Sequence, residues 1–109
     1  MSRRSGVRAA APVFAALGDE TRLALVARLS SDGPASISRL TSGSAVTRQA
    51  VTKHLHVLAG AGLVRDVRQG RERIWALESE HLEDARRFLD RVSQGWDDAL
   101  ARLRKHVEE

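Results

Sequence analysis

The sequence predicts a mainly α-helical domain with one small β-hairpin. Apolar residues recur at helical spacing through most of the chain, and a run of β-forming residues around Gly70 interrupts this pattern once. A chain of 109 residues has the size of one domain. We divide it into a flexible basic N-terminal tail (1–11), a helical domain with its hairpin (12–77) and a terminal helix of the same domain (78–109).

The N-terminal tail gives way to a first helix at Pro12. Residues 1–11 show no core-forming spacing, which favours a mobile segment. The arginines of this tail are Arg3, Arg4 and Arg8. Proline is tolerated in the first turn of a helix, so we expect a short helix at 12–17 that Gly18 ends.

A second helix is expected directly after Gly18. Asp19 is suited to cap it, because its carboxylate can accept hydrogen bonds from the free N–H groups of the first turn. The sequence DETRLALVARLSS then continues at helical spacing. We assign its inner face to Leu23, Val26, Ala27 and Leu29.

A third, short helix follows the Asp32-Gly33-Pro34 turn. Ser36 is suited to cap it, and Ile37 and Leu40 point inward from it. Residues 41–44 are turn-forming and lead into another helix. Two short helices joined by a tight glycine-containing turn are typical of the helix-turn-helix motif.

The stretch VTRQAVTKHLHVLAGAGLV, residues 46–64, predicts the second helix of this pair. Thr47 is suited to cap it, and Val46 and Val51 are spaced to form a hydrophobic staple across the cap. At about 100° per residue, two faces separate. The apolar face holds Val51, His54, Leu55, Leu58 and Gly62, and the polar face holds Gln49, Thr52, Lys53 and His56. Gly60 and Gly62 end the helix.

Residues 63–77, LVRDVRQGRERIWAL, predict two strands around a turn at Gly70. Their β-forming side chains are Val64, Val67, Ile74 and Trp75. The register stays open, because turns of different length place different residues opposite Val67. Four cations, Arg65, Arg68, Arg71 and Arg73, surround the tip against Asp66 and Glu72. A hairpin directly after a helix-turn-helix pair is a wing, so the sequence predicts a winged helix-turn-helix.

The last segment, from about Ser79 to the C-terminus, predicts one long helix. Its apolar residues follow alternating steps of three and four, the spacing of helices that pack along their length. We expect dimerisation through the terminal helices, with packing onto the same chain as the alternative, and Gly95 is a candidate bend. The expected dimer interface comprises Phe14, Leu17, Leu82, Ala85, Leu89, Val92, Trp96, Ala99 and Leu103, and Phe88, Leu100 and Val107 widen the stripe.

The charge of the chain is uneven along its length. Residues 1–77 contain 12 Lys and Arg against 5 Asp and Glu, whereas residues 78–109 contain 6 against 9. This distribution favours a polyanionic partner for the N-terminal part. The absence of cysteine excludes disulfides and thiolate metal sites, and no apolar run approaches the ~20 residues of a membrane span. We therefore expect a cytoplasmic protein without membrane contact.

Three segments match one family in order. They are FAALGDETRLALVARL (14–29), the helix-turn-helix segment at 46–64, and VRQGRERIWAL (67–77). Together they resemble the ArsR/SmtB family of dimeric winged-helix transcriptional repressors, in a branch that lacks an obvious metal site. The resemblance implies a homodimer that binds a palindromic operator in double-stranded DNA, without a cofactor and with an inducer that the sequence does not reveal.

The resemblance also places a set of polar residues toward DNA. They are Thr47, Arg48, Gln49, Thr52, Lys53 and His56 from the recognition helix and Arg68, Arg71 and Arg73 from the wing. Gln49 has the chemistry to pair with adenine, Arg48 or Lys53 with guanine, and Thr52 with a thymine methyl or a phosphate. His54 falls on the inner side, so we interpret it as a packed, hydrogen-bonded histidine.

Alternatives to this interpretation stay open. A protein-interaction module would present its basic face to an acidic protein. A metal-responsive repressor would need a site without cysteine, and the sequence holds no Asp-x-His pair. Its candidate ligands are His81, Asp84, Asp97, Asp98, His106 and Glu109. His106 and Glu109 are three residues apart and could share a face, but we interpret them as solvated residues at the end of the helix. No nucleophile elbow or glycine-rich phosphate loop is present, so we expect no enzyme.

Overall fold

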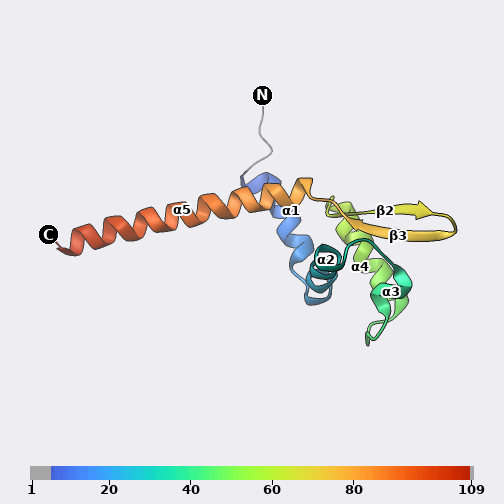
Figure 1. The fold of residues 1–109 in the computed structure, drawn as a ribbon. Helices are drawn as coiled ribbons and strands as arrows, with labels where there is room; N and C mark the ends of the chain where they lie inside the picture. The colour runs from blue at the N-terminus through green and yellow to red at the C-terminus, as the bar shows by residue number, and fades with distance from the viewer. Residues whose placement is uncertain (1–5, 109) are drawn as a thin grey trace, which may run out of the picture.

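The computed structural model describes residues 6–108 as five α-helices and three β-strands (Figure 1). In chain order these are α1 (Val7–Leu17), α2 (Glu20–Asp32), β1 (Ala35–Ser36), α3 (Ile37–Thr41), α4 (Arg48–Gly60), β2 (Val64–Gln69), β3 (Glu72–Leu77) and α5 (Glu80–Glu108). The first four helices and the hairpin form one body, and α5 projects from it on the side opposite the hairpin tip (Figure 1). The predicted mainly helical fold with a small hairpin is confirmed.

Helix α1 begins earlier than the sequence predicted. It starts at Val7, so the expectation of a tail up to residue 11 is wrong for residues 7–11, while Arg3 and Arg4 lie outside the described residues. Ala10 is buried because α1 packs along the first part of α5, where the Phe14 and Phe88 rings meet edge to face at 6.0 Å. This long-range packing extends the helix beyond its local signal.

Helix α2 is capped as predicted, but only part of its predicted inner face is buried. The Asp19 carboxylate accepts a hydrogen bond from the Arg22 backbone N–H at 3.0 Å. The buried residues are Leu25 and Leu29, whereas Leu23 is 52% exposed. Ala27 is exposed as well, and Val26 is half-buried. The expectation for Leu23 and Ala27 was wrong because this helix carries apolar residues around most of its circumference, so spacing alone did not select a face.

The sheet contains three antiparallel strands in the order β1-β3-β2, of which β1 was not predicted. Val67 lies opposite Ile74, which settles the register, and a two-residue turn of Gly70 and Arg71 joins β2 to β3. Gly70 has φ +65°, whereas Arg71 does not have a positive φ. A positive φ at the first turn position alone is the pattern of a type II′ turn, which suits the twist of hairpin strands. β1 pairs with β3 at Trp75, which is 1% exposed.

Helix α5 is continuous from Glu80 to Glu108, so the bend considered at Gly95 does not interrupt it. Its beginning packs onto the rest of the chain: Ala85 is buried and Leu82 is half-buried. Further along, its large apolar side chains lie exposed, namely Leu89, Val92, Trp96, Leu100, Leu103 and Val107. None of the helices in residues 6–108 has the length and apolar composition required to cross a bilayer.

Gly62 follows the end of α4 and contacts the beginning of α5. It has φ +75°, and the Leu63 N–H donates to the Leu58 carbonyl at 3.0 Å, which is the six-to-one bond of a Schellman motif. The His81 ring lies against Gly62 so closely that a Cβ at this position would overlap its Cδ2 atom. Glycine is therefore required here both by the backbone conformation and by the neighbouring ring.

We predict that Gly62→Ala lowers the free energy of unfolding by about 1–3 kcal/mol from backbone strain, with a further loss from the displaced His81 ring. Gly43→Ala is the matched control, because Gly43 has φ +72° and a Cβ added there would meet no heavy atom within 4 Å. Urea denaturation measures both variants. Equal losses at the two positions would contradict a role for the His81 contact.

Candidate nucleic-acid interface

Helix α4 is fixed at its N-terminus and along its underside. The Thr47 side chain accepts a hydrogen bond from the Ala50 N–H at 3.1 Å, which confirms the predicted cap. Val51, Leu55 and Leu58 are buried, as the apolar face predicted. The opposite face of the helix is therefore held outward, toward solvent.

The outward face of α4 carries the residues expected to read DNA. Thr47, Arg48, Gln49, Lys53 and His56 are exposed, and Thr52 is half-buried. An open hollow of about 340 Å³ is lined by Arg48, Gln49, Thr52, Lys53 and His56. The Thr52 hydroxyl donates to the Arg48 carbonyl at 2.9 Å, so its methyl group is the part of the side chain best placed to contact a base.

His54 joins α4 to the beginning of α2. Arg22 NH1 lies 3.3 Å from His54 Nδ1, within hydrogen-bond distance. The Arg22 Nε also donates to the Ala16 carbonyl at 2.6 Å, and the Asp19 carboxylate lies 3.8 Å from the same Nδ1. The prediction of a packed, hydrogen-bonded histidine is confirmed.

The Asp19 carboxylate is the acidic member of this group. Hydrogen bonding from the Arg22 backbone N–H holds the pKa of Asp19 below its ordinary value of 3.8, against the opposing effect of desolvation. The nearby His54 and the Arg22 guanidinium lower the pKa further. The ionised carboxylate is thus the form that suits the fold.

Some wing arginines are paired within the fold and others are available to a partner. Arg73 bonds to Asp66 on the neighbouring strand at 2.6 Å and lies over the Trp75 ring, 5.6 Å from its centroid. The hydrogen bond from Arg73 holds the pKa of Asp66 below its ordinary value. Arg68 and Arg71 are exposed and form no ion pair within residues 6–108. The wing cations that the fold leaves available are therefore Arg68 and Arg71.

A cavity of about 340 Å³ lies between α3, α4 and the wing. Sequence reasoning did not anticipate it, because its walls come from three separate parts of the chain. Its lining residues are Ser36, Ile37, Ser38, Arg48, Thr52, Arg71, Glu72, Arg73 and Trp75. Trp75 also contacts the His56 ring edge to face at 5.7 Å, so it connects the helix to the wing.

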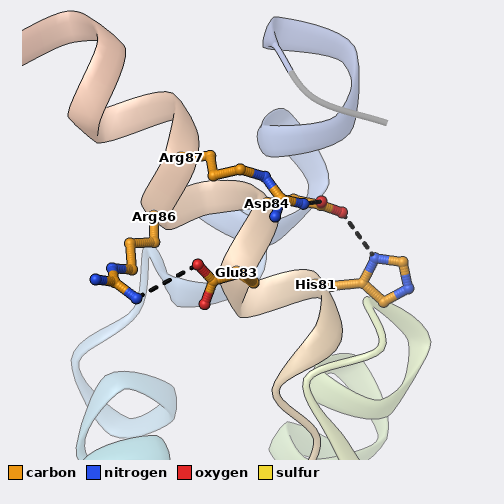
Figure 2. Close-up of polar contacts among 5 residues, drawn as sticks. All are labelled: His81, Glu83, Asp84, Arg86 and Arg87. Atoms are coloured by element: carbon orange, nitrogen blue, oxygen red, sulfur yellow. Dashed lines mark hydrogen bonds and ion pairs between the residues drawn. The ribbon is translucent and has the colours of Figure 1, made fainter. Parts of the chain in front are cut away.

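Two of the candidate metal ligands on α5, His81 and Asp84, lie within ion-pair distance of each other (Figure 2). The buried Asp84 carboxylate lies 3.4 Å from His81 Nδ1 and 2.8 Å from an Arg87 nitrogen, while Glu83 pairs with Arg86. Residues 6–108 contain no group of three or more His, Asp or Glu arranged to hold a metal ion. Glu109 lies outside the described residues.

Comparisons with known proteins match this chain to helix-turn-helix transcriptional regulators. A family model described as a helix-turn-helix domain matches residues 17–67. The HTH-type transcriptional regulator Rv2034 of Mycobacterium tuberculosis is 41% identical over 85 residues, covering 78% of this chain and 76% of that protein. The HTH-type transcriptional repressor SmtB of Mycobacterium tuberculosis is 33% identical over 92 residues, covering 84% of this chain and 66% of that protein.

A solved structure agrees over most of the chain. The ArsR-like transcriptional regulator from Rhodococcus sp. RHA1 has a TM-score of 0.74 and 38% identity, covering 89% of this chain and 91% of that one. The fold, the outward face of α4 and these matches define a winged helix-turn-helix transcriptional regulator that binds DNA. The chain belongs to the ArsR/SmtB family.

We predict that Asp19→Asn destabilises the protein at neutral pH but not in strong acid. A lowered carboxyl pKa in the folded state contributes stability that is present above the ordinary value of 3.8 and is lost as the pH falls through the lowered value. Asparagine keeps the capping geometry, so the difference between the two proteins isolates the charge. Urea denaturation across this pH range measures it, and a difference independent of pH would contradict the assignment.

Proposed function

We propose that this regulator is a homodimeric repressor that occupies a palindromic operator and excludes RNA polymerase. The observation that carries the proposal is the outward polar face of α4 beside two available wing arginines. In this arrangement α4 lies in the major groove, where Gln49 pairs with adenine and Lys53 with guanine. The Thr52 methyl contacts thymine, His56 and Thr47 lie toward the same groove, and Arg68 and Arg71 contact phosphates.

The proposed dimer rests on the exposed apolar stripe of α5. Trp96 is 64% exposed and Leu103 is 58% exposed, and four further large apolar residues lie on the same helix. An extended apolar surface of this kind on a small domain marks an interaction site, and a second copy of α5 is the complementary surface. Two-fold symmetry then gives an operator with two half-sites about 10 bp apart or a multiple of that.

We predict that Gln49→Ala and Lys53→Ala relax sequence preference. Duplexes recovered by selection from a randomised library serve as the operator, and fluorescence anisotropy compares them with point-substituted duplexes. Each variant loses discrimination at its own base position by about 1–3 kcal/mol, since each removes one base contact. Binding without sequence preference by the unaltered protein would favour the protein-interaction module instead.

We predict that Trp96→Glu gives a monomer that binds the full palindrome about 100-fold or more weakly, because the two half-sites are no longer engaged together. Since Trp96 is 64% exposed in the single chain, the domain itself is expected to stay folded. Light scattering reports the mass and anisotropy reports the affinity.

Gln94→Glu is the matched control for this dimer test. It adds the same charge to α5 at an exposed position on the opposite side of the helix from the apolar stripe. The Gln94 variant is expected to remain dimeric with unchanged affinity. A dimer of full affinity after Trp96→Glu would contradict the assignment of α5.

A further inference from the structure

The cavity between α3, α4 and the wing concentrates positive charge from two sides. Arg48 reaches it from α4, and Arg71 and Arg73 reach it from the wing. Glu72 is the carboxylate among its lining residues, so three guanidinium groups face one acidic group. The Ser36 and Ser38 side chains add hydroxyl groups on the α3 side. This combination of cations and neutral donors suits a small oxyanion.

Arg48 is directed toward this cavity rather than along the outward face alone. Its NH1 atom lies 3.5 Å from the Ser38 hydroxyl oxygen, at the outer limit of a hydrogen bond. So long a bond in an exposed position is weak, and the guanidinium keeps most of its donors for another acceptor. Arg73, in contrast, is already bonded to Asp66 at 2.6 Å.

Trp75 lines the same cavity, and the N–H group of its indole is buried. Its Nε1 is the buried side-chain nitrogen or oxygen in residues 6–108 that has no hydrogen-bond partner. Buried polar groups in proteins are nearly always hydrogen-bonded, so an unpartnered one beside a cationic cavity requires an explanation. The indole also provides a spectroscopic reporter, because the chain contains only one other tryptophan.

The position of the cavity matches the path of a DNA strand. In a duplex, a sugar-phosphate backbone separates the major groove from the minor groove. With α4 in the major groove and the wing in the adjacent minor groove, that backbone passes between α4 and the wing, where the cavity lies. We infer that the cavity seats one phosphate of the DNA backbone, held by Arg48 and Arg71 from opposite sides.

This inference rests on the proposed DNA binding and changes the role of one residue within it. Arg48 has the chemistry to read guanine, but a guanidinium that binds a phosphate carries no sequence information. Arg48→Ala is therefore expected to weaken binding evenly across duplexes, whereas Gln49→Ala and Lys53→Ala change the preferred sequence. Arg48 positions α4 on the duplex, and Gln49 and Lys53 distinguish its bases.

The test replaces single phosphates of the selected duplex by neutral methylphosphonates. Replacement at one position in each half-site is expected to weaken binding of the unaltered protein about tenfold, because a charged hydrogen bond is lost. For Arg48→Ala the same replacement has a smaller effect, because Arg71 alone still contacts this phosphate. The slope of log affinity against log salt falls by about 2, since each dimer loses two phosphate contacts. Arg48→Lys retains the charge and is expected to restore part of the effect.

Arg68→Ala is the control variant for this scan. Arg68 is exposed on the wing but does not line the cavity, so its substitution leaves the phosphate coupled to Arg48 unchanged. If the unaltered protein binds no duplex at all, the proposed function fails. If it binds, but each methylphosphonate has the same effect with and without Arg48, this inference alone is overturned.

A second measurement identifies the source of the phosphate. Inorganic phosphate is titrated against chloride at equal ionic strength while the indole N–H resonance of Trp75 is followed. If inorganic phosphate leaves the resonance unchanged and the scan couples Arg48 to one DNA phosphate, the DNA backbone is supported as the source of the phosphate. A saturable shift that requires Arg48, without a coupled DNA phosphate, supports a phosphate site but overturns the backbone as its source. If neither the coupling to a DNA phosphate nor the shift of the resonance is observed, the proposed phosphate site is overturned.

Discussion

Burial of the underside of α4 is the interaction on which the rest of the structure depends. Leu55 and Leu58 are fully buried, and each contributes about 1.5–3 kcal/mol relative to an exposed side chain. The Thr47 cap adds about 1 kcal/mol, and exposed ion pairs such as those on the wing contribute little because solvent screens them. The apolar contacts therefore set the rotation of α4 about its axis, and that rotation decides which polar side chains face outward.

The fold sorts its arginines by the contacts that each one makes. Arg22 bonds to Ala16 and His54, and Arg73 bonds to Asp66, so these two cations connect elements of the fold. Arg48, Arg68 and Arg71 are exposed around the outward face of α4 and the wing. Net charge alone gives no such division. The local surface potential comes from the cations that the fold leaves without strong partners.

Sequence reasoning succeeded where the signal was local. The caps at Asp19, Ser36 and Thr47, the two faces of α4 and the turn at Gly70 each depend on residues a few positions apart. It failed where distant segments decide the outcome. The early start of α1 depends on α5, strand β1 depends on β3, and the Arg73–Asp66 pair depends on a register that the sequence left open. The cavity at Arg48 and Arg71 combines three such segments, so no motif indicates it.

Helix α5 carries the exposed apolar stripe, and its first turns contact the residues that hold α4 in place. Its first turns pack against α1 through Phe88, and His81 lies against Gly62 immediately after α4. Asp84, 5% exposed, lies within ion-pair distance of both His81 and Arg87, which restrains the ring at that contact (Figure 2). Since packed interiors transmit displacement, the direction in which α5 leaves the domain is tied to the position of α4. In a dimer formed through α5, these contacts would therefore set the distance between the two outward faces.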